Sequence, residues 1–283
     1  MATASAASSF EVEGFTTTPI DVLSEAEAAA CLQELDAYAA RVPHGRITDE
    51  WRFQTHLFLP WVAERIVRNA ALLRAVSAAL GSEDLLAWFT EWHIKESSSQ
   101  GRYTPHQDST YAGLEPPDKA LTAWVALTEA DEENGAVTFY PRSHHAQLPH
   151  VEEPGDSTNL LLKGQRIPDE HLPEGGGGGG PVVVPLRPGQ ATLHAFRLVH
   201  ASGPNRSRAR RRVGLAVRFV TAEVRQMGRL REGAMLVSGR DVGQHFDLRP
   251  VPKEPWDAAG VALHRQEMAT MSVNYMSRSE KER

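Results

Sequence analysis

The sequence predicts a mainly β protein with helical additions, built on an antiparallel sandwich or barrel. Short apolar or alternating segments follow one another from residue 86 onward, and no helical pattern separates them, which argues against a parallel α/β sheet. Tight-turn signals divide these segments, as at Glu133-Asn134-Gly135 and Pro188-Gly189. A jelly roll is the commonest form of such an arrangement. The expected strands are Leu86–Lys95, Ala120–Thr128, Ala136–Tyr140, Pro181–Leu186, Gln190–Phe196 and Val213–Val220.

The segment before these strands is expected to be helical. Ser24 followed by Glu27 is a capping-box pattern, and apolar residues then recur on one helical face between positions 28 and 39. A second helix is expected from Trp61 to Leu80, where the apolar residues again recur at helical spacing. Gly81 is expected to end it, because glycine commonly follows the last turn of a helix.

The first expected strand, Leu86–Lys95, is aromatic and alternating. Residues at every second position of a strand point to the same side. Trp88, Thr90, Trp92 and Ile94 are therefore expected to share one face.

Composition limits the partners and the compartment. The formal net charge of -6 argues against a general binder of nucleic acids or membrane surfaces. The single cysteine, Cys31, allows no intrachain disulfide, fits a reducing compartment and is interpreted as a small core residue. No apolar run reaches the roughly 18–20 residues of a membrane span, and Met1–Phe10 lacks the features of a secretory signal. We expect a cytoplasmic protein whose partner is a small-molecule substrate, not a nucleic acid or a membrane; the oligomeric state stays open.

A length of 283 residues allows one large domain or two small ones. We expect a single domain over residues 1–283, with a helical part at 1–85, the β core at 86–220 and a C-terminal extension at 221–283. The six glycines Gly175–Gly180 are interpreted as a flexible surface loop, with a mobile lid as the alternative.

A candidate metal motif begins at His106-Gln107-Asp108. On a strand, residues i and i+2 point the same way, so His106 and Asp108 can both reach one ion. Two imidazoles and one carboxylate form the facial triad of non-haem iron(II), which leaves three positions for a co-substrate and oxygen.

The tripeptide alone is weak evidence, because the chain contains three His-x-Asp or His-x-Glu matches. His150/Glu152 lies in a proline- and acid-rich stretch that is interpreted as a solvated surface loop. His245/Asp247 is followed by His264, in a segment of helical character. After His106 comes a run of strands and then His200, a turn at residues 201–205, and a basic run that ends in Arg212 at the start of a strand. An arginine in that place can meet a dicarboxylate with two parallel hydrogen bonds.

These motifs resemble the phytanoyl-CoA dioxygenase family. The segment Thr104–Tyr111 is similar to its first metal motif, and residues 121–127, Glu133-Asn134-Gly135 and 141–144 resemble its central strands and the following turn. His200–Asn205, followed by Arg212–Leu215, resembles its second metal motif and co-substrate arginine. The similarity covers roughly residues 86–220 and is weaker through the N-terminal helices.

The resemblance implies a double-stranded β-helix, a jelly-roll and cupin-like core, that uses iron(II), 2-oxoglutarate and oxygen. It implies that His106, Asp108 and His200 are the catalytic metal ligands. It further implies that Arg212 pairs with the C5 carboxylate of 2-oxoglutarate and that Ser202 helps to hold it. The basic run is a residue longer than the usual form, so Arg211 is the alternative anchor; we prefer Arg212 from its register against the strand.

The expected reaction is hydroxylation of an unactivated C–H bond, with release of succinate and CO2. Related halogenases carry a small residue where Asp108 stands here, which makes room for chloride, so Asp108 favours hydroxylation. The family's substrates are varied, and the substrate and the oxidised position stay open. The candidate substrate-binding residues are Gln107, Tyr111, Trp124, His56 and Lys95.

Two alternatives belong to other classes of protein. A non-catalytic cupin-like binding or sensing protein would keep the fold without the chemistry, but every member of the triad and the arginine are present. A nucleic-acid binder would use the arginines of the segment 206–212, but the chain is acidic and this segment adjoins a metal ligand.

Overall fold

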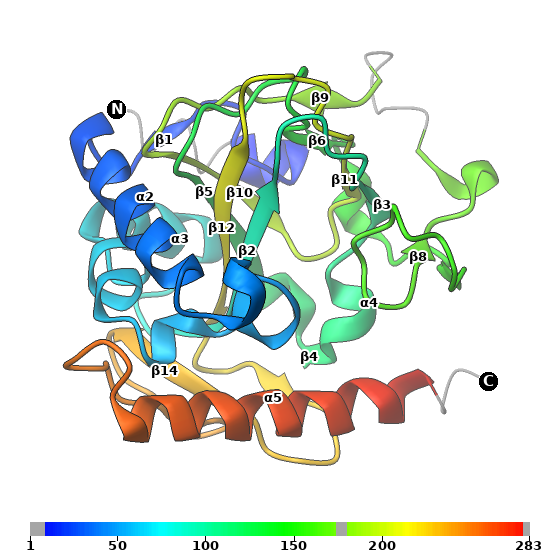
Figure 1. Cartoon of the computed structure of the whole chain (residues 1–283). Helices are drawn as coiled ribbons and strands as arrows, with labels where there is room; N and C mark the ends of the chain where they lie inside the picture. The colour runs from blue at the N-terminus through cyan, green and yellow to red at the C-terminus, as the bar shows by residue number, and fades with distance from the viewer. Residues whose placement is uncertain (1–8, 174–179, 280–283) are drawn as a thin grey trace.

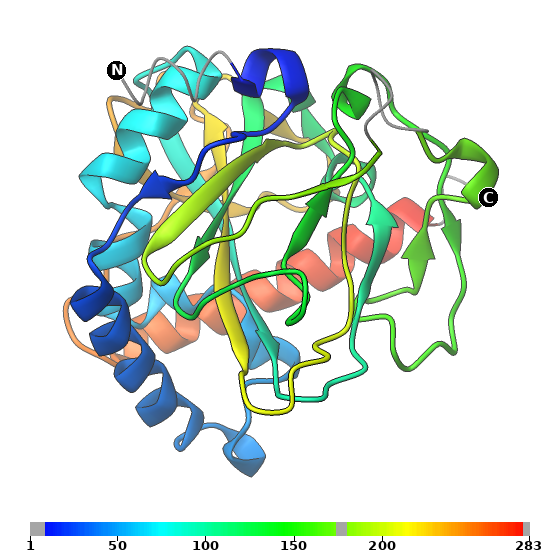
Figure 2. The same ribbon diagram turned by 90° about the horizontal axis from the view of Figure 1, so that it is seen from above.

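Two sheets face one another in the computed structural model, which describes residues 9–173 and 180–279 (Figures 1 and 2). The major sheet has the strand order β1-β10-β5-β12-β2-β14-β15, and the minor sheet has the order β3-β11-β6-β9. The major sheet consists of β1 (Ile20–Asp21), β10 (Gln190–Ala195), β5 (Ala120–Ala126), β12 (Arg212–Thr221), β2 (Leu85–Lys95), β14 (Gly233–Ser238) and β15 (Asp247–Leu248). The minor sheet consists of β3 (Tyr103–His106), β11 (His200–Ser202), β6 (Val137–Phe139) and β9 (Val182–Val183).

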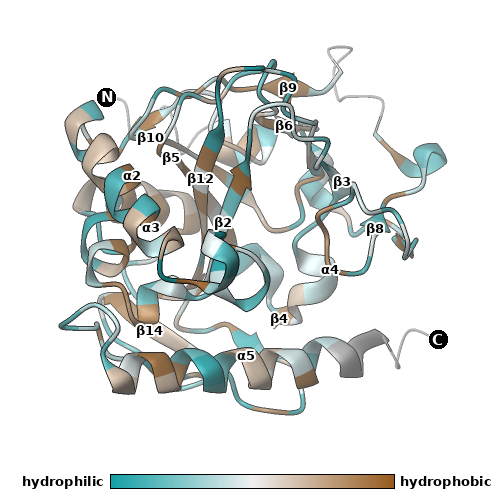
Figure 3. Ribbon diagram, in the orientation of Figure 1, coloured by the Kyte–Doolittle hydropathy of each residue, from teal (hydrophilic) through white to brown (hydrophobic). Residues whose placement is uncertain are grey.

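Helices cover the outer face of the major sheet. The helices α2 (Glu25–Ala39) and α3 (Ala70–Leu80) lie beside it, and α5 (Ala258–Ser279) runs along one end of the molecule (Figure 1). Apolar side chains of α2 and α3 share one buried cluster with those of β2, β5 and β12, and hydrophobic residues colour parts of these strands brown in Figure 3. Two short pairs, β4 (Leu114–Glu115) with β13 (Arg225–Gln226) and β7 (Val151–Glu152) with β8 (Gln165–Arg166), complete the sheets.

The predicted first helix is confirmed, but the predicted second helix is two helices. Ser24 and Glu27 form both hydrogen bonds of the capping box at the start of α2, and Cys31 is buried as expected. The segment 61–80 divides into a π-helical stretch, Val62–Val67, and α3. Asn69 causes the break, because its side chain accepts hydrogen bonds from the first turn of α3 and so caps a new helix. Gly81 ends α3 in the left-handed conformation, as predicted.

A β-bulge changes the expected face of the first strand. Arg218 of β12 pairs with Phe89, whereas Phe219 pairs with Ala87, so Trp88 is an extra residue on β2. Trp92 and Ile94 belong to the apolar cluster shared with the helices α2 and α3, whereas Trp88 and Phe89 belong to a separate apolar cluster. The expectation that Trp88 shares a face with Trp92 was therefore wrong.

The interior of the sandwich is lined by alternate residues of two long strands. On β12, Val213, Leu215 and Val217 pack on the outer side with the helices. The residues between them, at positions 212, 214, 216 and 218, therefore face the minor sheet. Gly214 is required there, because a Cβ atom would lie 2.1 Å from the Trp124 side chain. On the paired strand β2, the odd-numbered residues face inward, so Glu91, His93 and Lys95 lie in the same interior.

The major sheet extends beyond the segment 86–220, since β1 precedes it and β14 follows it in the chain. The predicted strand Pro181–Leu186 forms only the two residues of β9. Residues 174–179, which include most of the glycine run Gly175–Gly180, lie outside the described residues. Within the described ranges, no helix is both long enough and apolar enough to cross a membrane.

Candidate metal centre

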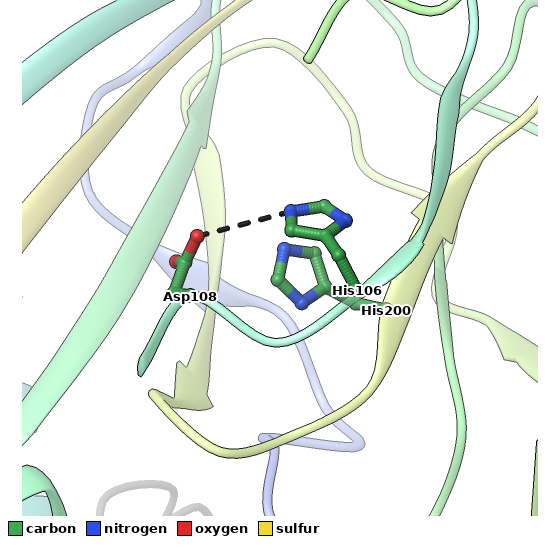
Figure 4. Close-up of side chains that lie close together, drawn as sticks. All are labelled: His106, Asp108 and His200. Atoms are coloured by element: carbon green, nitrogen blue, oxygen red, sulfur yellow. Dashed lines mark ion pairs between the residues drawn. The ribbon is translucent and has the colours of Figure 1, made fainter. Parts of the chain in front are cut away.

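His106, Asp108 and His200 converge between the two sheets (Figure 4). His106 is the last residue of β3, and Asp108 follows it at the start of the short helix α4 (Ser109–Ala112). His200 opens β11 and stands opposite His106 in the antiparallel register. One ligand atom of each residue lies within 4.8 Å of the others, and within residues 9–173 and 180–279 these three form the candidate metal-binding group.

Backbone hydrogen bonds orient both imidazoles toward the same point. His106 Nδ1 lies 2.8 Å from the carbonyl oxygen of Thr104, and His200 Nδ1 lies 3.0 Å from that of Leu198. Since a carbonyl only accepts, each Nδ1 must carry the proton and each Nε2 keeps a lone pair for a metal. Burial and the neighbouring imidazoles lower the pKa of both histidines to about 3, so both are neutral.

Asp108 is held as an ionised carboxylate. Thr122 Oγ1 donates to its Oδ2 at 2.6 Å, and Arg218 Nη2 donates to its Oδ1 at 3.2 Å. Burial opposes the charge, but the Arg218 guanidinium outweighs it, so the pKa of Asp108 lies well below its ordinary value. Two neutral imidazoles and one carboxylate fit a divalent iron ion, which accepts this ligand set.

Arg212 lies fully buried at the far end of the interior from Arg218, on the same face of β12. Its Nη1 donates to the carbonyl oxygen of Gly135 at 2.8 Å and to Ser202 Oγ at 3.2 Å. Its Nε and Nη2 are buried and have no hydrogen-bond partner among the described residues. A buried guanidinium with two unsatisfied donors lacks an anion, and a carboxylate is the group that fits.

The alternative arginine faces outward. Arg211 is half-buried and pairs with Asp36 of α2 at 2.7 Å, whereas Arg212 points into the sandwich. The alternation of a strand allows only one of two neighbours to face the interior. Of the two candidates, Arg212 is the one that the structure places beside Ser202.

Lys95 and Trp124, two of the predicted substrate contacts, lie on this same side of the interior. Lys95 Nζ is 2.6 Å from Ser202 Oγ, and burial together with Arg212 lowers the pKa of Lys95 to about 6. The ring of Trp124 lies under the guanidinium of Arg212, with 5.1 Å between the ring centroid and Arg212 Cζ. Burial lowers the pKa of Arg212 only to about 10, so Arg212 is the cation that stays charged near neutral pH.

Two cavities adjoin the metal ligands. The inner cavity is lined by all three ligands together with Trp124 and Ser202. The outer cavity, of about 420 Å³, is lined by His106 and Asp108 together with residues of α5. Gln107 and Tyr111, two of the predicted substrate contacts, line the outer cavity. Gln107 also fixes the neighbouring loop, since its Nε2 donates to the carbonyl oxygen of Ala146 at 2.8 Å. His56 does not line this cavity; it is buried, with its Nδ1 3.0 Å from Thr90 Oγ1.

The sequence reasoning missed four charged or polar groups of the site. Glu91 and Arg218 line both cavities, and His93 and His194 line the inner one. Strand alternation could have found Arg218, which lies six residues beyond Arg212 on the same face. His150 was interpreted as a solvated surface residue, and this was wrong: it is half-buried, and its Nε2 accepts the backbone N–H of Gln107 at 3.0 Å.

One chain of polar contacts runs from Trp124 through His93, Glu91 and Arg218 to Asp108. Trp124 Nε1 donates to His93 Nδ1 at 3.2 Å, so His93 carries its proton on Nε2, which lies 3.4 Å from Glu91 Oε2. The same Glu91 oxygen accepts from Arg218 Nη1 at 3.2 Å. Glu91 therefore holds Arg218 in place, and Arg218 in turn fixes the Asp108 oxygen that faces His106 at 3.8 Å.

Replacing Arg218 with methionine is expected to weaken metal binding by roughly 10- to 100-fold, the usual effect of losing a group that orients a metal ligand. Cobalt(II) titration followed by absorbance measures it, with the melting temperature as a check on folding. Arg218→Lys should recover part of the affinity, because the charge remains but the two-pronged geometry is lost. Arg225→Met, at an exposed position of β13, is the control. Equal cobalt affinity in Arg218→Met and in the control would rule out this positioning role.

A jelly-roll core with two histidines, one carboxylate and a buried arginine on the facing strand defines the class of iron(II)- and 2-oxoglutarate-dependent oxygenases. Comparison with known proteins agrees with this class. The chain matches the phytanoyl-CoA dioxygenase (PhyH) family over residues 10–213 and belongs to that family. The family uses iron(II) with 2-oxoglutarate and oxygen as co-substrates.

The relatives share the fold at modest identity. Phytanoyl-CoA dioxygenase domain-containing protein 1 of Danio rerio is 32% identical over 125 residues, which are 42% of this chain and 40% of that protein. The chain thus spans less than half the length of this curated relative. A solved structure of the non-heme monooxygenase ThoJ is 29% identical, with a TM-score of 0.82 and coverage of 98% of this chain and 99% of that one. A nickel complex of ThoJ is 28% identical, with a TM-score of 0.74 and the same coverage.

Proposed function

We propose that this protein hydroxylates an unactivated C–H bond of a small molecule and couples the reaction to the conversion of 2-oxoglutarate into succinate and CO2. The observation that carries the proposal is Asp108, an ionised carboxylate that stands beside both histidines and also lines the outer cavity. A carboxylate ligand leaves no place for a halide at that position. The single buried cysteine supports a reducing, cytoplasmic setting.

Each group of the site has a role in this proposal. His106, Asp108 and His200 hold the metal, and Arg212 with Ser202 hold the far carboxylate of 2-oxoglutarate. When bound, iron(II) with 2-oxoglutarate and oxygen supplies the oxidant for the C–H bond. Gln107 and Tyr111 line the outer cavity together with His106 and Asp108, so they help to orient the substrate and to exclude water.

A product analysis under labelled oxygen tests the reaction type. A panel of small amines, acids, phosphonates, amides and acyl-CoA esters is screened for substrate-dependent succinate release with iron(II) and 2-oxoglutarate. Turnover of the best substrate under ¹⁸O₂ with excess chloride or bromide is expected to give a product that carries one labelled oxygen and no halogen. Asp108→Ala is the comparison, since it should lose this turnover.

Other outcomes would contradict the proposal in different ways. A halogenated main product would overturn the role given to Asp108. A product without added oxygen would overturn hydroxylation but keep the co-substrate. Binding of iron and 2-oxoglutarate without succinate from any compound would favour a cupin-like binding or sensing protein.

A further inference from the structure

The outer cavity is walled by parts of the chain that lie far apart in the sequence. The 3-10 helical turn Asp49–Arg52 and β2 form one side, and residues 160–162 form another. The helix α5, which runs along one end of the molecule (Figure 1), contributes Met268, Met271 and Tyr275 to the lining. These last residues lie outside the segment 10–213 that matches the family. The size and character of the substrate space therefore depend on a helix that the family match does not include.

The wall of this cavity is predominantly apolar. The apolar lining residues are aromatic residues on or near β2, leucines of the segment 160–162 and methionines of α5. They are Phe53, Trp88, Phe89, Leu160, Leu161, Leu162, Met268 and Met271. Apolar walls of this kind bind apolar ligand surface, and about 420 Å³ lies within the range of pockets for drug-sized molecules. The two methionines add a wall that can adapt its shape, because their side chains are flexible and polarisable.

The two cations in the lining already have carboxylate neighbours. Arg218 pairs with two carboxylates: its Nη1 lies 3.2 Å from Glu91 Oε2, and its Nη2 lies 3.2 Å from Asp108 Oδ1. Arg52 Nη2 lies 3.6 Å from Glu91 Oε1, and its Nε is buried without a hydrogen-bond partner among the described residues. A substrate anion would thus compete with Glu91, whereas a neutral hydrogen-bond acceptor near Arg52 would not.

The rim of the cavity is acidic. Asp49 and Glu50 both line the opening and are exposed, and no lysine belongs to the described lining. The nucleotide part of coenzyme A carries several phosphate charges, which need basic side chains at the point where the acyl group enters. Carboxylates at this rim would repel those phosphates.

We propose that the substrate is an uncharged, predominantly apolar small molecule with a hydrogen-bond acceptor directed toward Arg52, and not a coenzyme A thioester. This inference rests on the proposed function only for the statement that the occupant of the cavity is the substrate. Met271 of α5 is the residue proposed to set the size of the cavity, since it lines the wall from an element that carries none of the metal ligands.

Four probes share a naphthalene ring and differ in charge, so they separate the effect of charge from that of shape. They are the neutral N-methyl-2-naphthamide, the anion 2-naphthoate, the cation 2-naphthylmethylamine and the thioester 2-naphthoyl-coenzyme A. Their dissociation constants are measured by calorimetry without oxygen, with the protein carrying iron(II) and 2-oxoglutarate and again without metal. The neutral amide is expected to bind at least about tenfold more tightly than the naphthoate and the thioester, because burying an unpaired charge is costly.

Two matched variants locate the binding. Met271→Trp, which fills the cavity, is expected to weaken binding of the amide at least about tenfold, a loss of about 1.4 kcal/mol. Met227→Trp, the same substitution at a position that is 60% exposed, is expected to leave it unchanged.

Several results would overturn the inference. They are equal or tighter binding of the naphthoate or of the thioester, tenfold tighter binding of the amine, equal losses in the two tryptophan variants, or no binding of any probe. The proposed function fails in another way: a protein that binds the amide but neither iron nor 2-oxoglutarate would refute the reaction and leave the substrate class standing.

Discussion

Replacing His106 with alanine is expected to abolish stoichiometric iron(II) binding and, with it, all 2-oxoglutarate-dependent turnover. His106 Nε2 is one of the two neutral imidazole donors, and the bond from its Nδ1 to the Thr104 carbonyl leaves it no other orientation. Its ring lies 4.2 Å from that of His200, centroid to centroid, so its loss removes one of the two imidazoles that meet at this point. Metal content after dialysis and anaerobic titration with iron(II) measure the effect.

The matched control is His245→Ala, because it removes the histidine of another His-x-Asp tripeptide. Asp247 of that tripeptide pairs with Arg231 at 2.9 Å and is not part of the metal-binding group. The control is expected to bind one equivalent of iron with unchanged affinity. Loss of metal from His245→Ala together with retention in His106→Ala would show that the metal lies elsewhere.

Strand alternation explains why so much of the site could be predicted. A period of two residues makes the choice between Arg211 and Arg212 a question of parity, since one of two neighbours must face outward. The side chain of Val213 belongs to the outer, helix-packed face, so Arg212 faces inward. The parity inference needs only local geometry, which the sequence contains. For His106 and Asp108 the strand argument was wrong, because β3 ends at His106 and Asp108 lies beyond it in helical conformation at the start of α4; the turn between them brings the carboxylate to the site.

The parts that escaped prediction depend on partners distant in the chain. Glu91 becomes a site residue only because β2 lies next to β12 in the sheet, a pairing of segments more than a hundred residues apart. The bulge at Trp88 is likewise a property of the paired strands and not of β2 alone. The role of α5 as a cavity wall depends on where the whole helix docks, which the sequence of the helix alone does not determine.

The largest expected effect on co-substrate binding comes from Arg212. The C5 carboxylate of 2-oxoglutarate is buried when the keto acid reaches the metal, and a buried carboxylate needs a paired, hydrogen-bonded cation. Arg212 offers Nε and Nη2, two adjacent donors that no described residue uses, and Trp124 and Gly135 fix the guanidinium in place. Lys95 cannot take over this role, because its amine already contacts Ser202 and its pKa is lowered to about 6.

Arg212→Met is therefore expected to lose on the order of 3–5 kcal/mol of 2-oxoglutarate binding, or about two to four decades of affinity. Iron binding should survive, because Arg212 hydrogen-bonds to Ser202 and Gly135 and to none of the three metal ligands. Anaerobic titration of 2-oxoglutarate into iron-loaded protein measures the loss, and Arg211→Met is the control, since that arginine pairs with Asp36 on the outside. A large loss in Arg211→Met with none in Arg212→Met would place the anchor one residue earlier, and no loss in either would remove the basis for a 2-oxoglutarate site at this end of the sandwich.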